Sequence, residues 1–266
     1  MGKSENRLTW VSGDREYDEL DETSRKFLAA SSSGTSIFDP VLCELSYRWF
    51  CPPGGKILDP FAGGSVRGIV ASCLGFEYTG VELRGEQVAA NRAQVHVATG
   101  PAPTWHQGDS RHITSIAPGS YDMIFSCPPY ADLEVYSDNP DDLSTLPYDE
   151  FLPAYESIIS AAVSLLADNR FAVFVVGDVR DKRGNYYGFP WHTIAAFQKA
   201  GMHLYNEAVL VTAAGSLPIR AGKQFRTSRK FGKTHQNVLC FVKGDGKKAT
   251  AACNAANDNN QPEAAA

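Results

Sequence analysis

The sequence predicts an α/β fold in which a mostly parallel sheet is covered by helices on both faces. Short apolar runs alternate along the chain with segments of helical periodicity, which is typical of such sheets. A chain of 266 residues with 43% hydrophobic content can bury one sizeable core. A glycine-rich turn directly follows the first apolar run, as in sheets that bind ligands at the carboxyl ends of their strands.

The apolar runs predict seven strands, at residues 56–59, 78–82, 104–108, 121–126, 171–177, 203–211 and 237–242. Helical patterns predict helices at residues 40–49, 65–74, 84–98, 149–167 and 190–200. Pro147 and Asp149 mark the start of the fourth helix. No helical pattern separates the last two strands, so we expect them to pair antiparallel around a loop.

The composition predicts a single folded domain at residues 36–244. Residues 1–35 are polar and acidic with little apolar periodicity, so we expect a mobile N-terminal arm. Residues 245–266 are rich in Lys, Ala and Asn, and we expect this low-complexity tail to be disordered. No long apolar run marks a membrane span or signal peptide, which predicts a cytoplasmic protein without membrane contact.

The chain has six cysteines and six histidines, but their spacing does not match that of metal ligands. We therefore expect no metal. The formal net charge of −5 argues weakly against nucleic-acid binding. The charge is uneven, however, because the loop around residues 220–233 lacks acidic residues and interleaves Phe225 and Phe231 with basic ones. Its cations, which we expect to contact nucleic-acid phosphates rather than to form a merely solvated surface, are Arg220, Lys223, Arg226, Arg229, Lys230 and Lys233.

Two short motifs lie at the ends of predicted strands. The strand at 56–59 runs into Asp59-Pro60-Phe61-Ala62-Gly63-Gly64-Ser65, and the strand at 121–126 runs into Ser126-Cys127-Pro128-Pro129-Tyr130. Two consecutive prolines remove two backbone donors, so the sheet cannot continue through them while the carbonyls can still accept hydrogen bonds. In this order and spacing, the motifs resemble those of the S-adenosylmethionine-dependent DNA amino methyltransferases, which modify adenine N6 or cytosine N4. The resemblance implies a doubly wound, Rossmann-like methyltransferase sheet ending in an antiparallel hairpin.

The resemblance implies S-adenosyl-L-methionine as cofactor, and the residues themselves favour it. A carboxylate at Asp59 would repel the diphosphate of a dinucleotide but attract a methionyl ammonium, and the G-x-G-x-x-G fingerprint is missing. We expect Phe61, Gly63, Gly64 and Ser65 to line the site. Glu82, at the end of the second strand, is placed to accept the ribose hydroxyls. By resemblance, Asp109 accepts the adenine amino group and Phe38 covers the methionine end.

At the transfer site, the resemblance gives the Cys127 side chain and the Pro128 carbonyl the role of accepting the two N–H groups of the base. Such hydrogen bonds would localise the lone pair of the amine. Pro129 fixes the turn and Tyr130 would stack on a base that has left the duplex. The family usually has Asp, Asn or Ser where this chain has Cys127, and a thiol accepts weakly, so Ser126 or the Pro128 carbonyl could carry more of the task. The serine-like size of cysteine favours cytosine N4 slightly over adenine N6.

Three alternatives remain open from the sequence. Cys127 could act as a nucleophile in pyrimidine C5 methylation. The chain could be a catalytically weak nucleic-acid-binding module of the same fold, or it could methylate RNA or a small molecule. Since about sixty residues separate the motifs, too few for a separate recognition domain, recognition of DNA would fall to inserted loops, a partner subunit or a homodimer.

Overall fold

The computed structural model describes residues 38–130, 142–212 and 217–255. The chain divides into two compact units. The larger unit comprises Ile37–Leu210 and His235–Ala266, and the smaller comprises Met1–Ser36 and Val211–Thr234. The predicted arm at 1–35 and the tail beyond residue 255 lie outside the described residues.

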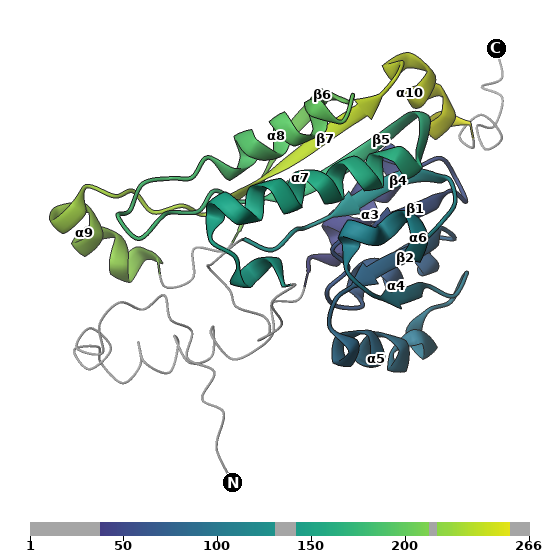
Figure 1. Ribbon diagram of the computed structural model, residues 1–266, viewed down its shortest axis with the longest axis horizontal. Coiled ribbons are helices and arrows are strands. Elements are labelled where there is room, and N and C mark those ends of the chain that lie inside the picture. Colours follow the sequence, from purple (N-terminus) through teal and green to yellow (C-terminus); the bar gives the residue numbers. More distant parts are fainter. Residues whose placement is uncertain (1–37, 131–141, 213–216, 256–266) are drawn as a thin grey trace, which may run out of the picture. The chain divides into compact units, whose positions relative to one another are not determined.

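A seven-stranded sheet in the order β3-β2-β1-β4-β5-β7-β6 forms the fold (Figure 1). The strands are β1 (Lys56–Asp59), β2 (Glu77–Glu82), β3 (Thr104–Gln107), β4 (Tyr121–Ser126), β5 (Leu166–Val176), β6 (His203–Val211) and β7 (His235–Lys243). The first five are parallel, with Leu58 beside both Thr79 and Ile124, and β7 runs antiparallel to β5. The chain therefore reverses its strand order between β1 and β4, where sheets of this kind bind ligands.

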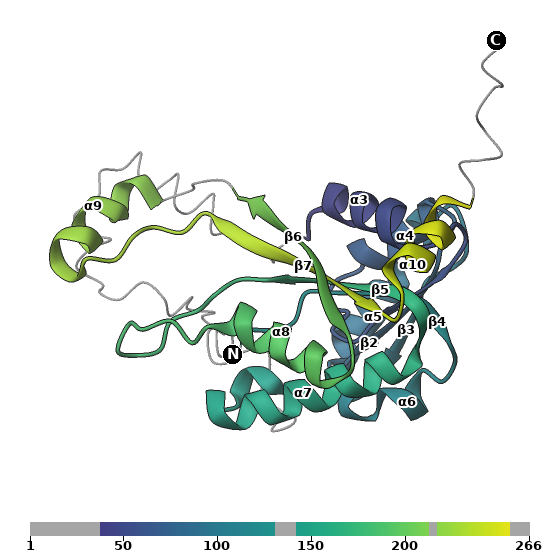
Figure 2. The ribbon, with the colours of Figure 1, turned by 90° about the horizontal axis from the view of Figure 1, so that it is seen from above.

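Helices cover both faces of the sheet (Figure 2). The helices are α3 (Pro40–Phe50), α4 (Val66–Cys73), α5 (Gly85–Ala93), α6 (Ile113–Ile116), α7 (Tyr148–Leu165), α8 (Phe189–Lys199), α9 (Leu217–Ser228) and α10 (Gly246–Asn254). One core lies under α6, α7 and α8, and a second lies under α3, α4, α5 and α10. Side chains alternate along each strand, so Ile57 enters one core and Leu58 the other. Among the described residues, no helix has the length and hydrophobicity needed to span a membrane.

The predicted strands and the five predicted helices are all present, and β1, β4 and β6 have the predicted bounds. The largest shifts are of five residues: β5 begins at Leu166, directly after α7 ends at Leu165, and α5 ends at Ala93 rather than at residue 98. α3 begins where Asp39 caps it, accepting hydrogen bonds from the Val41 and Leu42 amides, with Pro40 in the first turn.

The prediction of disorder from residue 245 is wrong for the first part of this segment. Asp245 accepts hydrogen bonds from the Lys247 and Lys248 amides and caps α10. The helix then buries Ala249 completely and Cys253 largely against the sheet. Two small apolar side chains on one face thus give this alanine-rich segment a core contact.

Candidate active site at the carboxyl ends of the strands

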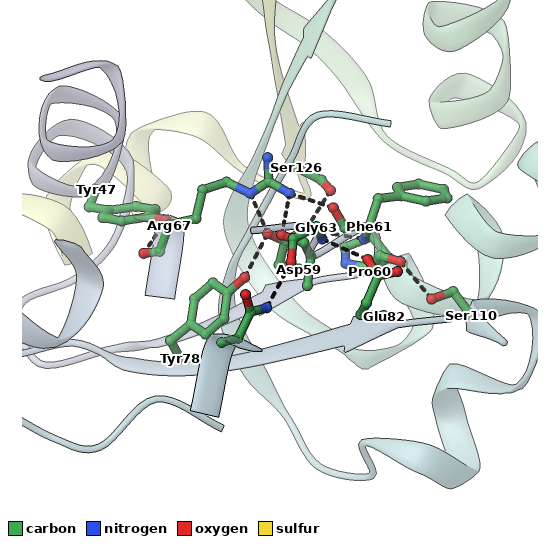
Figure 3. Close-up of polar contacts among 12 residues, drawn as sticks. Tyr47, Asp59, Pro60, Phe61, Gly63, Arg67, Tyr78, Glu82, Ser110 and Ser126 are labelled. Atoms are coloured by element: carbon green, nitrogen blue, oxygen red, sulfur yellow. Dashed lines mark hydrogen bonds and ion pairs between the residues drawn. The ribbon is translucent and has the colours of Figure 1, made fainter. Parts of the chain in front are cut away.

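The carboxylate of Asp59 is the centre of a buried hydrogen-bond network (Figure 3). Asp59 ends β1 and has no exposed surface. Its Oδ1 accepts from the Phe61 amide at 3.1 Å and from Ser126 Oγ at 2.5 Å. Its Oδ2 accepts from Arg67 Nε at 2.6 Å and from the Tyr78 hydroxyl at 2.8 Å. Both predicted motifs are therefore joined through this one side chain.

Arg67, on α4, holds the turn that follows Asp59. Its guanidinium is buried, donates to the carbonyls of Phe61 and Ala62, and lies 4.9 Å from the centre of the Phe38 ring. Burial alone would lower the pKa of Arg67, but the Asp59 carboxylate raises it above its ordinary value. The guanidinium therefore stays charged and cross-links the turn to the end of β1.

The glycine turn, residues 62–64, is fixed by two hydrogen bonds at Gly63 and borders open space at Gly64. Gly63 has φ +50°, a conformation that favours glycine, and its amide donates to Glu82 Oε2 at 2.9 Å. Asn91 Nδ2 donates to the Gly63 carbonyl at 2.7 Å. A Cβ added to Gly64 would have no atom within 4 Å. The turn thus presents open space beside the Glu82 carboxylate, whose side chain is 12% exposed.

The glycine turn also lies directly against β2. The Ala62 amide donates to the Val81 carbonyl at 3.0 Å. A Cβ added to Gly80 would lie 2.7 Å from the Ala62 Cβ, too close for any side chain. Glycine at position 80 therefore allows the turn to pack onto the neighbouring strand.

Three further predicted cofactor residues, Ser65, Asp109 and Phe61, also have partners within the protein. Ser65 Oγ donates to Gln94 Oε1. Asp109 accepts from the amide and guanidinium of Arg111, which orients its 18% exposed carboxylate and begins a short 3-10 helix. Phe61 packs its ring against Tyr155 at a centroid distance of 5.9 Å. Ser65 and Asp109 thus have roles in local structure besides the ones predicted from sequence.

The end of β4 carries the second motif, and its aromatic ring is held by residues of β7 and α8. The Tyr130 hydroxyl accepts from Gln236 Nε2, on β7, at 2.7 Å. Its ring packs edge-on to Phe189 at 6.0 Å, and a Cβ added to Gly177, just past β5, would lie 3.5 Å from its hydroxyl oxygen. Cys127 is half-buried and packs against the core under α3. Tyr130 and Cys127 therefore belong to the same edge of the sheet as the glycine turn.

Ser126 differs from its expected role as a substrate-facing acceptor. The side chain is fully buried, and its hydroxyl donates to Asp59. Asp59 likewise has no exposed oxygen with which to meet an ammonium group. The geometry gives both residues a positioning role, in which they fix the glycine turn relative to the end of β4.

The predicted basic loop of the smaller unit is in part a helix. α9 (Leu217–Ser228) contains Arg220, Lys223 and Arg226, and the chain after it carries Arg229, Lys230 and Lys233. The rings of Phe225 and Phe231 stack at 5.6 Å, and the Arg229 guanidinium lies 5.2 Å from the Phe225 ring centre. The expected loop is wrong over residues 220–228, because α9 forms there despite Gly222, a residue type that disfavours helices.

Sequence reasoning missed Arg67, Tyr78, Asn91 and Gln236, which orient the site from other elements. A signal existed for Arg67, since it is the one charged residue of the otherwise uncharged α4. A charged side chain that is buried with such a helix requires a partner of opposite charge or hydrogen-bond acceptors. Within the described ranges, no three His, Cys, Asp or Glu side chains cluster as metal ligands would.

Comparisons with known proteins identify the fold. No protein-family model matches the sequence, and the search of curated proteins found no match. TrmN from Thermus thermophilus is similar in structure, with a TM-score of 0.53 and 17% identity over 83% of this chain. The match covers 53% of TrmN, so the chain spans about half its length.

Two further solved structures are similar over nearly their whole length. Magnesium protoporphyrin IX methyltransferase (ChlM) from Synechocystis PCC 6803, with bound SAH, has a TM-score of 0.50 and 14% identity, covering 86% of this chain and 98% of ChlM. PH1948 from Pyrococcus horikoshii, provisionally assigned as an RNA methyltransferase, has a TM-score of 0.50 and 13% identity, covering 84% and 98%. At these identities the comparisons show a Rossmann-like methyltransferase fold.

Proposed function

We propose that the protein transfers a methyl group from S-adenosyl-L-methionine to an exocyclic amine of a DNA base, with cytosine N4 favoured slightly over adenine N6. The observation that carries this proposal is the 2.5 Å hydrogen bond between Ser126 and Asp59. It joins a glycine turn suited to the cofactor and a Cys-Pro-Pro-Tyr turn suited to a planar amine, on neighbouring parallel strands. Direct transfer requires that the methyl donor and the accepting amine be held close together, and both proposed turns lie at the carboxyl ends of the same sheet.

The described residues fit the proposed cofactor. The open space at Gly64 admits a ligand against the backbone, and the Glu82 carboxylate beside it can accept ribose hydroxyls. Asp109 and Phe38 lie at the neighbouring strand and helix ends and would contact the adenine and methionine ends. When bound, S-adenosylmethionine would supply an activated methyl group on a sulfonium. Asp59 and Arg67 would contribute by holding the turn rather than by touching the ligand.

On the acceptor side, this chain's own residues would bind and orient the amine. The Pro128 carbonyl and Cys127 would accept its hydrogen bonds, while Pro129 restricts the turn and Tyr130 stacks on the base. Because Ser126 is engaged with Asp59, we assign the main acceptor role to the Pro128 carbonyl. Two hydrogen bonds that localise the nitrogen lone pair would favour its attack.

The test is incubation of purified protein with methyl-labelled S-adenosylmethionine and unmethylated DNA, followed by nucleoside mass spectrometry. N4-methylcytosine or N6-methyladenine is the expected product, and Tyr130→Phe serves as a matched variant that keeps the ring. If 5-methylcytosine appears and Cys127→Ser abolishes it, Cys127 is a nucleophile and the direct-transfer mechanism is wrong. Label in RNA but not DNA would reassign the substrate, and cofactor binding without any product would favour a binding module.

A further inference from the structure

A stiff hairpin, residues 178–188, follows β5. It belongs to the larger unit and, in Figure 2, extends beyond the beginning of α8. The Asp178 carboxylate closes its base by accepting from the amides of Val179, Gly188 and Phe189. The Tyr187 amide donates to the Val179 carbonyl at 2.9 Å. The two arms are therefore fixed to each other and to the start of α8.

Aromatic packing attaches the hairpin to the domain. The Tyr187 ring stacks on Tyr148 of α7 with a centroid distance of 3.8 Å and an angle of 11°. Tyr148 in turn shares a 2.8 Å hydrogen bond with His192 Nδ1 on α8. Contacts to two helices make the hairpin a rigid extension of the sheet edge rather than a loose loop.

The hairpin presents positive charge and an exposed ring. Lys182 and Arg183 are exposed, and neither forms an ion pair with any described residue. The one acid at the tip, Asp181, is used within the turn, where it accepts from the Asn185 amide at 2.7 Å. The Arg180 guanidinium lies 3.6 Å from the centre of the Tyr186 ring, which is 45% exposed. Cations interleaved with aromatic rings suit a nucleic-acid backbone and its bases.

The hairpin begins immediately beside the proposed acceptor site. A Cβ added to Gly177, the residue before Asp178, would lie 3.5 Å from the Tyr130 hydroxyl oxygen. The strands that lead to the two segments, β4 and β5, pair in parallel with Ser126 opposite Phe174. A polyanion bound along the hairpin would therefore lie next to Tyr130, within the same unit.

We propose that the hairpin binds the phosphate backbone of the DNA strand whose base enters the acceptor site. This inference rests on the proposed function and adds a second DNA-contact surface to the basic segment at residues 220–233. The hairpin differs from that segment because it belongs to the same compact unit as Tyr130. Lys182 and Arg183 contact phosphates, while Tyr186 and Arg180 offer a stacking surface for a neighbouring base.

The experiment compares Lys182→Glu/Arg183→Glu with Lys247→Glu/Lys248→Glu, a control that makes the same charge change at exposed residues of α10. Fluorescence anisotropy with a labelled DNA oligonucleotide, over a series of salt concentrations, measures affinity. Calorimetry measures cofactor affinity, and circular dichroism checks folding. The hairpin variant should bind DNA about tenfold more weakly, and the slope of log K against log salt should fall by about two. The control variant should keep the affinity and slope of the parent more closely.

The outcomes separate this inference from the function on which it rests. Equal DNA affinity of the hairpin and control variants would overturn the hairpin proposal and leave methyl transfer intact. A parent protein that binds cofactor but neither binds nor methylates DNA would overturn the proposed function itself. Tighter binding of an RNA oligonucleotide of the same sequence would overturn the commitment to DNA. If Lys182→Glu/Arg183→Glu fails to fold, Lys182→Ala/Arg183→Ala supplies the same comparison without introducing acids.

Discussion

The cofactor side and the acceptor side of the candidate site are held in place by different forces. The glycine turn depends on a buried ion pair between Asp59 and Arg67, with both charges almost fully removed from water. Tyr130, on the acceptor side, is held by ring packing and a neutral hydrogen bond from Gln236. Removing the buried ion pair should therefore destabilise the fold, whereas removing the Tyr130 ring should weaken the binding of the substrate.

Arg67→Met should destabilise the protein more than any other single change considered for the site. This change leaves the Asp59 carboxylate buried without its counter-charge, so the free energy of unfolding should fall by about 3–5 kcal/mol in urea denaturation. Adding Asp59→Asn removes the orphaned charge and should recover part of the loss. A decrease in the free energy of unfolding no greater than about 1 kcal/mol, as for surface ion pairs, would show that the buried ion pair does not stabilise the cofactor side as described.

Tyr130→Ala should separate transfer from cofactor binding. Loss of base stacking, worth about 1–3 kcal/mol, should slow methyl transfer about tenfold to hundredfold and leave cofactor affinity unchanged. Tyr130→Phe keeps the ring and gives up only the hydrogen bond with Gln236, so it should retain most of the rate. Equal loss of cofactor affinity and rate in Tyr130→Ala would contradict the division into two sides.

Gly64→Val should impair the cofactor side without destabilising the fold. No atom lies within 4 Å of a Cβ at this position, so the folded protein should keep its melting temperature. The new side chain would fill the space assigned to the ligand and lower cofactor affinity about tenfold, or ~1.4 kcal/mol, by calorimetry. Gly222→Val, in α9, is the control. Undiminished cofactor binding by Gly64→Val would place the ligand elsewhere.

The smallest effect concerns pH and the hairpin. Hydrogen bonds from the backbone at Asn185 lower the pKa of Asp181 below its ordinary value of 3.8. Because the pKa of Asp181 is lower in the folded protein than in the unfolded chain, the ionised carboxylate stabilises the turn at pH values above the unfolded-state pKa. This stabilisation is lost as the pH falls through the folded-state pKa. Below about pH 4, amide hydrogen exchange at Asn185 should accelerate relative to the intrinsic rate. Asp181→Asn should abolish this pH dependence, and a persistent one would assign it to another group.

The strands could be predicted from sequence because their apolar runs are bounded by glycine, proline or charged residues. The run at 203–211, for example, coincides with β6. α9 and α10 could not be predicted in the same way. α10 contacts the core through Ala249 and Cys253 within an alanine-rich segment, and Gly222 in α9 disfavours a helix. In both helices, tertiary contacts or local hydrogen bonds outweighed the weak helical preference of the sequence.

For the site, the sequence predicted which strand ends meet but not how the side chains pair. The proximity of the two motifs follows from the parallel pairing of β1 and β4. The hydrogen bond from Ser126 to Asp59 depends instead on rotamers and burial, which the sequence does not encode as a spacing, so the sequence alone assigns Ser126 to the substrate. Arg67 pairs with Asp59 across the glycine turn, and no spacing rule predicts that contact.

The close packing of Ala62 on Gly80 provides a way to compare this chain with others of the same fold. A Cβ at position 80 would come within 2.7 Å of Ala62, so a chain with any larger residue there must move its glycine turn away from β2. That shift would also separate Gly63 from Glu82. The pair of small residues at positions 62 and 80 is therefore a discontinuous signature. It can distinguish, in an aligned sequence, chains that keep this turn geometry from chains that share only the sheet.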